Sequence, residues 1–454
     1  MHFANWGNYP TVDTLSYNQL SIAELASFIR DNHGFIARGN GRSYGDASLN
    51  RNSILNLSKA RFNKYGMVYN SADREMIVNS GCALTDVLNN YFPEHVIFPV
   101  IPGTKKISIG GAIAADIHGK DHHINGTLSN HISCIDLMTA SGEMITATPE
   151  KNSDLFWATC GGQGLTGLIV SATIKMIKTE TNVLRQRVTA CESLDKLIAT
   201  TLEQNNSQYC ASWIDLSCTR THGRGIAFSG RFASAAEVME QGNQFLEKKY
   251  SNSRLSVPCY CTSKLFNQTT VKSFNSLYYY LNKRKNNPFA SINGFFFPLD
   301  AVNNWNRLYG HKGVVQYQFV VPQKEVLQKI VNVIKKEKLY STLGVLKVFG
   351  KQPKHFGNLS FPMEEYSLAM DFKLSHGLFK TLDYLDEIVA DAGGHVYLAK
   401  DSRMKASTFR RMYGKAVDDF LEVKAKYDPN GKFCSLLSKR LKLNVVSVKV
   451  TNTF

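Results

Sequence analysis

A chain of 454 residues is too long for one compact core, so its length predicts two or three domains. Its apolar fraction of 43% and charged fraction of 20% are ordinary for a soluble globular protein. The net charge of +16 favours an anionic partner, which is a nucleic acid, a membrane surface or a phosphorylated substrate. We expect no nucleic-acid binding, because no helix-turn-helix, zinc-finger or aromatic RNA-binding pattern accompanies the charge.

The nine cysteines are an odd number scattered along the chain, which predicts reduced thiols rather than a disulfide framework. Cys259 and Cys261 are the only close pair, and no second pair follows at zinc-like spacing, so we expect two partly buried thiols and no metal. Residues 1–13 lack the basic and apolar regions of a signal peptide, and no apolar run has the roughly 20 residues that cross a bilayer. The expected compartment is the cytoplasm.

The first elements lead to two glycine-rich loops. Ser21 and Glu24 form a capping box, which predicts that a helix begins there. The apolar residues of this helix share one face, and they are Ile22, Leu25, Phe28 and Ile29. Strands are expected at residues 35–37, 54–57, 67–69, 76–78 and 95–101, with a helix at 84–91. The loops follow the first and last of these strands, at residues 38–46 and 102–120.

The pattern of elements changes after a strand at residues 168–177, which a hairpin at 132–139 and 144–148 precedes. From about residue 179 to 394, amphipathic helices alternate with well-separated strands. This pattern predicts an antiparallel sheet covered by helices, which are expected at residues 235–248, 326–338 and 379–392. Residues 420–443 are expected to be helical around an Asp-Pro-Asn-Gly stop signal.

The first glycine-rich loop places Gly39, Gly41 and Gly45 directly after a predicted strand. Glycines allow positive φ and let consecutive backbone N–H groups point at an anion. The spacing is G-x-G-x-x-x-G, which differs from the dinucleotide-binding G-x-G-x-x-G. Such a loop alone is a weak signal, because tight turns often need the same glycines.

Residues 162–167 do match G-x-G-x-x-G as a string. A dinucleotide-binding helix should begin directly after that motif, but residues 168–174 are rich in β-branched side chains that favour a strand. We therefore reject a Rossmann-type NAD site at this position.

The second loop contains a Pro-Gly-Thr turn followed by Gly110 and Gly111 and by small alanines. These residues let the backbone pass close to a flat or charged group. His118 and Lys120 come next, and we expect the following His122 and His123 to be surface residues.

Both loops, together with the motif Phe-Trp-Ala-Thr-Cys-Gly-Gly-Gln-Gly-Leu-Thr-Gly at residues 156–167, resemble the FAD domain of vanillyl-alcohol-oxidase-type flavoproteins. Within that group, the chain resembles the decaprenylphosphoryl-β-D-ribose 2′-oxidases nearly end to end. Further motifs of this resemblance lie at residues 298–300, 316–318, 347–350, 397–403 and 428–429. The resemblance implies an α+β fold with a two-subdomain, PCMH-type FAD-binding domain and a substrate domain built on an antiparallel sheet covered by helices.

The same resemblance implies three parts of the chain. Residues 1–181 would form the FAD-binding domain and residues 182–395 the substrate-binding domain, while residues 396–454 would return to the FAD domain. The first loop would hold the FAD diphosphate, and Tyr397 would contact the isoalloxazine. The implied cofactor-binding residues are Arg38, Gly39, Asn40, Gly41, Arg42, Ser43, Tyr44, Gly103, Thr104, Gly110, Gly111, Ile117, His118, Gly119 and Tyr397.

Side-chain alternation along strands at residues 313–322, 343–349 and 366–372 puts polar groups on one sheet face and apolar groups on the other. From the residues alone, the polar face is a solvent-facing surface. The resemblance makes it instead a roof over the flavin. The expected substrate-binding residues are Lys120, Gln316, Gln318, Lys347, Ser367 and Lys400, with Lys120 and Lys347 placed to bind a phosphate.

The resemblance implies that FAD oxidises the 2′-hydroxyl of a polyprenyl-phospho-ribose to a 2′-keto sugar. This is the first half of an epimerisation to arabinose in arabinan and cell wall biosynthesis, completed by a short-chain reductase partner. Lys400, Tyr397 and His118 are the expected catalytic residues. Lys400 can act as a base only if burial or a nearby cation lowers its pKa, and the alternative is an ion pair with Asp401.

Several residues depart from the pattern on the predicted substrate side. Ala369 and Ser367 stand where mycobacterial relatives carry cysteine and asparagine, and Phe296 and Phe297 replace a Tyr-His pair. A soluble aldonolactone or alditol oxidase is therefore the alternative enzyme. A membrane or nucleic-acid binding protein with a vestigial flavin site is the alternative from another class.

Residues 278–285 combine aromatic with basic side chains. Such segments suit an anionic interface, so we expect peripheral contact with the inner face of the membrane. The alternative is an ordinary helix end followed by a solvated turn.

The residue at position 42 predicts how the cofactor is held. Many relatives that attach FAD covalently carry histidine where Arg42 stands, and arginine cannot form that bond. We therefore expect non-covalent FAD, so that acid precipitation releases intact flavin into the supernatant. A fluorescent flavin band on a denaturing gel would contradict this prediction.

Overall fold

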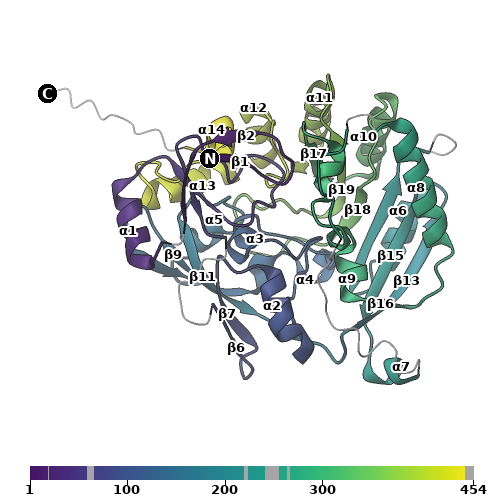
Figure 1. Cartoon of the computed structure of the whole chain (residues 1–454), viewed down its shortest axis with the longest axis horizontal. Coiled ribbons are helices and arrows are strands. Elements are labelled where there is room, and N and C mark those ends of the chain that lie inside the picture. The colour runs from purple at the N-terminus through teal and green to yellow at the C-terminus, as the bar shows by residue number, and fades with distance from the viewer. Residues whose placement is uncertain (19, 59–65, 219–222, 241–254, 263–265, 445–454) are drawn as a thin grey trace.

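The computed structural model describes residues 1–18, 20–58, 66–218, 223–240, 255–262 and 266–444. They form an α+β fold in which most strands pair antiparallel (Figure 1). No helix within these residues is both long enough and apolar enough to cross a membrane.

The N-terminal part is built on two main sheets. The parallel sheet has the order β3-β5-β4, with bounds Leu15–Asn18, Ser53–Asn56 and Phe35–Arg38. The antiparallel sheet has the order β10-β9-β11-β7-β6, with bounds Met144–Ala147, Ile132–Met138, Leu168–Lys175, Glu75–Asn79 and Met67–Asn70. Two strand pairs complete this part, β1 (His2–Ala4) with β2 (Thr11–Asp13) and β8 (Val96–Ile97) with β12 (Ile177–Lys178).

An eight-stranded antiparallel sheet follows, in the order β16-β13-β15-β14-β18-β19-β17-β20. The bounds in that order are Phe289–Ser291, Val183–Cys191, Arg224–Phe232, Tyr209–Asp215, Gly344–Phe349, Glu365–Lys373, Val314–Val321 and His395–Val396. Helices α6 (Leu194–Gln204), α10 (Lys324–Lys336) and α11 (Leu378–Asp391) pack on this sheet. The prediction of an antiparallel sheet covered by helices is therefore confirmed.

The two faces of this sheet differ as the alternation predicts. Tyr317 and Leu368 belong to the largest apolar core, with α10 and α11 packed against them. On the other face, Gln316 pairs with Asp371 and Lys347 pairs with Ser367. The polar side chains of three strands thus come together on the face that α10 and α11 leave free.

Helix α8 (Gln268–Lys283) packs on that polar side of the sheet, against the end formed by β13 and β15. Its Tyr279 contacts Trp213 and Ile226, whereas the neighbouring Ser212 bonds to Thr201 of α6. Because adjacent strand residues point to opposite faces, α6 and α8 cover opposite faces of the sheet. In Figure 1, α8 lies at the outer edge of the molecule, on the side away from α1.

The remaining helices connect these sheets. They are α1 (Ile22–Asp31), α2 (Leu84–Tyr91), α3 (Ile109–Ala114), α4 (His122–Asn125), α5 (Ser153–Thr159), α7 (Ala235–Glu240), α9 (Ile292–Phe296), α12 (Ala406–Tyr413), α13 (Lys415–Tyr427) and α14 (Leu436–Leu441). Short 3-10 helices lie at Phe92–Glu94, Leu128–His131, Pro298–Ala301 and Trp305–Tyr309.

Several local predictions are confirmed. Ser21 and Glu24 form the capping box of α1, β9 and β10 form the hairpin, and β11 directly follows residues 162–167. A strand in that place confirms that the glycine string there does not begin a Rossmann helix.

Other local predictions were wrong or incomplete. The second glycine-rich loop contains the helix α3, because Ser108 caps it by accepting a hydrogen bond from the Gly111 N–H. Only Val96 and Ile97 of the strand expected at residues 95–101 pair as a strand. Cys259 is exposed rather than partly buried. Residues 241–248 of one predicted helix lie outside the described residues.

The C-terminal residues pack back onto the N-terminal part. Phe433 forms a parallel bridge with Phe35, and the Cys434 N–H donates to the Phe35 carbonyl at 2.9 Å. Lys424 and Asp428 form a fully buried ion pair of 2.7 Å beside this bridge. The C-terminal residues thus contact the N-terminal part, and the division of the chain at residues 181 and 395 stays a prediction.

Arg440 of α14 joins the first glycine-rich loop to the C-terminal segment. Its guanidinium pairs with Asp46 at 2.8 Å and with Asp401 at 2.7 Å. Both carboxylates are nearly fully buried. Burial raises the pKa of Asp46 more than Arg440 lowers it, whereas Arg440 and Arg403 outweigh burial and lower the pKa of Asp401.

Replacement of Arg440 by alanine is expected to destabilise the protein strongly. It leaves two carboxylates buried without their partner, which costs about 3–5 kcal/mol of unfolding free energy. Urea unfolding followed by circular dichroism measures the loss. The matched control is Arg411→Ala, because Arg411 also binds two carboxylates but at the surface, where ion pairs contribute little. Equal midpoints for the two variants would contradict the prediction.

Candidate active site

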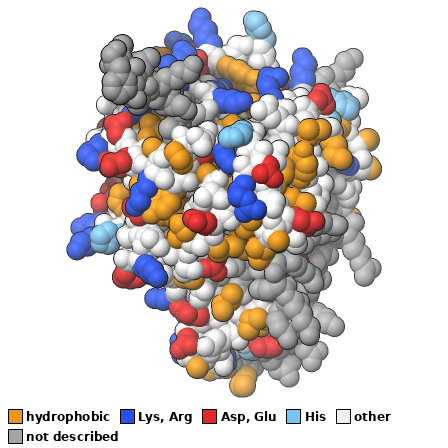
Figure 2. Space-filling view, turned by 90° about the vertical axis from the view of Figure 1, so that its left-hand side faces the viewer, with side chains coloured by type: hydrophobic (Ala, Val, Ile, Leu, Met, Phe, Trp, Pro, Cys, Tyr) orange, Lys and Arg blue, Asp and Glu red, His pale blue; other side chains and the backbone are white. Residues whose placement is uncertain are grey.

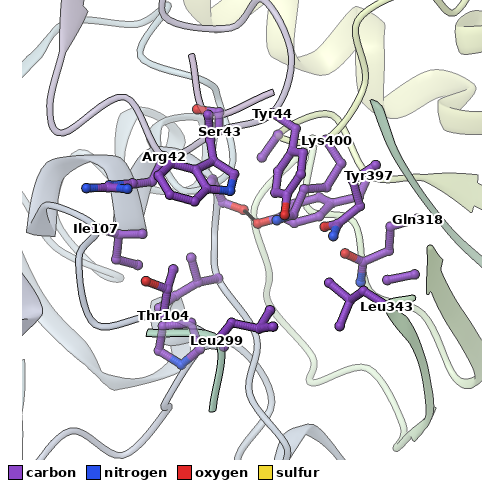
Figure 3. Close-up of a pocket in the computed structure, with 18 of the residues that line it drawn as sticks. Arg42, Ser43, Tyr44, Thr104, Ile107, Leu299, Gln318, Leu343, Tyr397 and Lys400 are labelled. Atoms are coloured by element: carbon purple, nitrogen blue, oxygen red, sulfur yellow. Dashed lines mark hydrogen bonds between the residues drawn. The ribbon is translucent and has the colours of Figure 1, made fainter. Parts of the chain in front are cut away.

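A cavity of about 820 Å³ lies between the two glycine-rich loops and the polar face of the eight-stranded sheet. Figure 3 shows side chains from all three directions around it. Those labelled in the close-up include Arg42, Tyr44, Thr104, Leu299, Gln318, Tyr397 and Lys400. Segments more than 300 residues apart in the sequence therefore share one cavity wall.

The first glycine-rich loop presents unused backbone donors to this cavity. Within the part of the chain that the structure describes, the N–H groups of residues 40–43 donate to no other residue. Gly41 has φ +61°, which allows the loop to turn. Gly45 passes so close to the C-terminal segment that a Cβ there would lie 1.6 Å from the Asp401 carbonyl oxygen. The loop is thus held in place and can receive an anion.

Two arginines support this loop in different ways. Arg42 lines the cavity above the Trp6 ring, at 4.5 Å, and its buried Nε has no partner among the described residues. Burial lowers the pKa of Arg42, and Asp300 opposes this effect. Arg38 does not line the cavity. It donates to the Ala4 carbonyl at 2.8 Å and to the Asn5 side chain, and so fixes the start of the loop to the N-terminal residues.

The second loop lines the cavity, but the backbone N–H groups of its two adjacent glycines are already used in hydrogen bonds within the protein. The N–H groups of Gly110 and Gly111 donate to the Ser80 carbonyl and the Ser108 hydroxyl. Gly110 is required because a Cβ there would meet Ser80 Cβ at 2.9 Å. The Thr104 hydroxyl donates to Asp300 at 2.8 Å, which links this loop to the short 3-10 helix Pro298–Ala301.

His118 lies at the centre of the site as a neutral ring. Its Nε2 lies 3.0 Å from Gln318 Nε2, and its Nδ1 has no partner among the described residues. The ring packs against Phe349 and Tyr397 at about 5 Å. Burial, with Lys347 adding to it, holds the pKa of His118 well below its usual range.

The expectation of a surface position was wrong for His122. Its ring is buried against Phe349 at 4.3 Å, because α4 packs on β18. Burial and the nearby Lys347 lower the pKa of His122 to about 3. His123 is half-buried and contacts the Ser207 carbonyl.

Lys120 and Lys347 bring two half-buried ammonium groups to the cavity. Lys120 binds the Phe295 carbonyl, and Lys347 donates to the Gly119 carbonyl at 3.1 Å. Burial and Lys347 lower the pKa of Lys120 to about 7. Burial and Lys400 lower the pKa of Lys347 to about 8, although Asp121 opposes them. Neither lysine forms an ion pair with a described residue, so both are able to bind an anion.

Lys400 reaches the cavity beside a buried carboxylate. Its Nζ lies 4.4 Å from the centre of the Tyr44 ring, and the Tyr44 hydroxyl donates to Asp371 at 3.3 Å. Gln316 donates to the other oxygen of Asp371 at 2.5 Å. Burial lowers the pKa of Lys400, and Asp371 opposes it. Burial raises the pKa of Asp371.

The alternative pairing of Lys400 with Asp401 was wrong. Asp401 binds Arg440 and the backbone N–H groups of Arg403 and Met404, so it points away from Lys400. Sequence reasoning did not select Asp371 as a site residue. The sequence did contain a signal for it, because Asp371 lies four residues after Ser367 in the same strand and therefore on the same face of the sheet.

Tyr397 lines the cavity by its ring. The ring stacks on Phe361 at 4.8 Å, and the hydroxyl donates to the Ala115 carbonyl at 2.8 Å. Burial raises the pKa of Tyr397, so the group stays a phenol. Its expected catalytic role stays a prediction.

The structure brings nearly all predicted site residues to this one cavity, the exceptions being Arg38 and Gly119. Sequence reasoning missed the apolar end, where the wall residues include Trp213, Phe228, Val271, Phe274 and Tyr278. They come from β14, β15 and α8, so no local motif links them. Of the four departures on the substrate side, Phe297 is buried and does not reach the cavity, whereas Phe296, Ser367 and Ala369 do.

Comparisons with known proteins agree with this geometry. Residues 18–148 match the model of an FAD binding domain, and residues 368–441 match the model of D-arabinono-1,4-lactone oxidase. The chain is 36% identical to decaprenylphosphoryl-beta-D-ribose oxidase of Mycolicibacterium smegmatis, over 90% of this chain and 89% of that protein. It is 30% identical to an uncharacterized Streptomyces coelicolor protein, over 76% of this chain and 95% of that one. Cytokinin dehydrogenase 9 of rice is 28% identical over 38% of this chain and 34% of its own length.

The cofactor is therefore FAD, and the residues of the cavity fit it. The free N–H groups of residues 40–43 and the unpartnered Arg42 Nε suit a diphosphate, because both favour an anion. The unpartnered Nδ1 of His118 lies farther along the same cavity, beside Tyr397. When bound, FAD supplies the hydride acceptor of an oxidoreductase.

The pH dependence of flavin reduction tests the pairing of Lys400 with Asp371. Lys400 accepts a proton only when neutral, so reduction should rise with pH through the Lys400 pKa and then level off. The Asp371 carboxylate favours the charged lysine, so Asp371→Asn should move this rise to lower pH by about one unit. Anaerobic stopped-flow reduction across a pH series measures it. In Lys400→Ala, FAD should stay bound and the rise should disappear, and a rise that Asp371→Asn leaves in place would refute the pairing.

Proposed function

This chain belongs to the family of FAD-binding oxidoreductases that includes decaprenylphosphoryl-β-D-ribose oxidase, and we propose that it oxidises the 2′-hydroxyl of a polyprenyl-phospho-ribose. The substrate loses a hydride from C2′ and a proton from its hydroxyl, and the product is the 2′-keto sugar. A separate short-chain reductase would complete the epimerisation to arabinose for a cell wall arabinan. The reaction would take place at the inner face of the membrane.

The observation that carries this proposal is the pair of half-buried lysines, Lys120 and Lys347, which face the cavity without an ion pair among the described residues. A buried ammonium group is costly unless an anion compensates it. A phosphate in the substrate provides that charge, whereas a neutral sugar does not. The apolar end of the cavity, at Trp213 and Phe228, suits the adjoining prenyl chain.

The remaining polar residues suit a sugar. Gln316, Gln318 and Ser367 lie on the sheet face above the cavity, where amides and a hydroxyl can orient neighbouring sugar hydroxyls. Lys400 is placed to take the hydroxyl proton, because burial favours its neutral form. Asp371 and Tyr44 hold the position and the charge state of Lys400.

The second candidate is a soluble aldonolactone or alditol oxidase. The match of residues 368–441 to D-arabinono-1,4-lactone oxidase favours it. The matched residues include Ala369, Asp371 and Lys400 of the cavity region. The smaller Ser367 and Ala369 also leave more room than the asparagine and cysteine expected from mycobacterial relatives.

Substitution of Lys347 separates the two candidates. Lys347→Gln should raise the KM for a prenyl-phospho-ribose by about 10- to 100-fold, as expected for the loss of one charged hydrogen bond. Anaerobic bleaching of FAD measures this value for the phosphorylated sugar and for free sugar lactones. Lys351→Gln, an exposed lysine near the end of the same strand, is the matched control and should match wild type. Bleaching by lactones alone, or an unchanged KM in Lys347→Gln, would favour the lactone oxidase.

A further inference from the structure

The outer face of α8 is an exposed apolar surface. Phe274, Leu277 and Leu281 follow one another at helical spacing, and their side chains are 52%, 59% and 62% exposed. Tyr280 extends the same face. Three large apolar side chains in one stripe are unusual on a helix that faces water, because a solvated helix face normally carries polar residues.

This surface adjoins the apolar end of the active-site cavity. Val271 and Tyr278 on the inner side of α8 line the cavity, and Phe274 belongs to both the cavity wall and the outer face. Tyr278 packs on Trp213 at 4.7 Å. The helix is therefore the wall between the cavity and the outside of the molecule.

The charges around this stripe have one sign. Residues 267–288 contain no aspartate or glutamate, and their basic residues, Lys272, Lys283, Arg284 and Lys285, are all exposed. Only Lys283 has an acidic partner, Glu192 at 3.3 Å, among the described residues. The opposite side of the molecule differs, because acidic and basic side chains are interspersed there (Figure 2).

We propose that the outer face of α8 docks on an anionic lipid bilayer. Phe274, Leu277 and Leu281 enter the interface, while Arg284 and Lys285 bind the headgroups, as in other basic amphipathic helices. The apolar end of the cavity then lies next to the bilayer, behind α8. This inference goes beyond the proposed reaction, since the surface itself does not depend on which sugar is oxidised.

A bilayer fits this surface better than a second copy of the chain. In a two-fold dimer the patch would meet a copy of itself, and its basic residues would find no opposite charge there, because residues 267–288 contain no aspartate or glutamate. The structure also changes which residues the sequence had indicated. Tyr279 is buried and Tyr278 faces the cavity, so Tyr280 is the one tyrosine of that segment exposed on this face. Phe274, Leu277 and Leu281 contribute the rest of the exposed apolar surface.

Co-sedimentation of the FAD-loaded protein with vesicles tests the proposal. At low salt, the wild type should sediment with vesicles of equal parts phosphatidylglycerol and phosphatidylcholine, and less with phosphatidylcholine alone. Leu277→Gln/Leu281→Gln should lower the partition coefficient by about tenfold or more, because two buried side chains are lost and glutamine still favours a helix. Arg284→Gln/Lys285→Gln should also lower it, by about tenfold, and should weaken its salt dependence.

The matched control is Leu15→Gln/Leu202→Gln, which changes two exposed leucines on β3 and α6. It should sediment as the wild type does, and FAD absorbance should show that all variants are folded. A wild type that stays in the supernatant, or an α8 variant that sediments unchanged, would overturn the proposal. An α8-dependent dimer without vesicles would assign the face to a second copy instead. Flavin reduction by detergent-solubilised substrate reports on the proposed function separately.

Discussion

The ion pairs of Arg440 connect the first glycine-rich loop to the C-terminal segment that carries Lys400. One carboxylate, Asp46, ends the first glycine-rich loop, and the other, Asp401, directly follows Lys400. The backbones of these two segments are in direct contact, since the Tyr44 N–H donates to the Ala399 carbonyl at 3.1 Å. A side chain at position 45 would clash with the Asp401 carbonyl, so only glycine fits there. The position of Lys400 above the Tyr44 ring follows from this arrangement.

Positive charge in the cavity is the second constraint. Lys120, Lys347 and Lys400 all line it, and Asp121 raises the pKa of Lys347 while Asp371 raises that of Lys400. Burial and mutual repulsion favour the neutral lysines. Such lysines can bind an anion when charged and can accept a proton when neutral.

The residues that depart from the mycobacterial pattern act on the substrate end. The centre of the Phe296 ring lies 4.7 Å from the centre of the Tyr209 ring and 5.9 Å from Lys120 Nζ. An apolar ring therefore lies next to the ammonium group of Lys120. Ser367 and Ala369 shorten two side chains above the cavity. The first glycine-rich loop and its donors do not depend on these changes. The FAD site therefore does not depend on these changes, whereas the wall at the other end of the cavity does.

The sequence alone determined the features that depend on near neighbours. The capping box of α1 follows from the spacing of Ser21 and Glu24, and the hairpin of β9 and β10 follows from its short turn. The two faces of β17 and β19 follow from the two-residue period of a strand. The glycine-rich loops of the FAD domain were found by their motifs and by the family resemblance. Only the tertiary structure decided that His122 is buried, that Lys400 faces Asp371 rather than Asp401, and that the outer face of α8 is apolar and exposed. The physical reason is that burial and charge depend on residues that are distant in sequence, such as Tyr44 and Asp371, which are 327 positions apart and form one hydrogen bond.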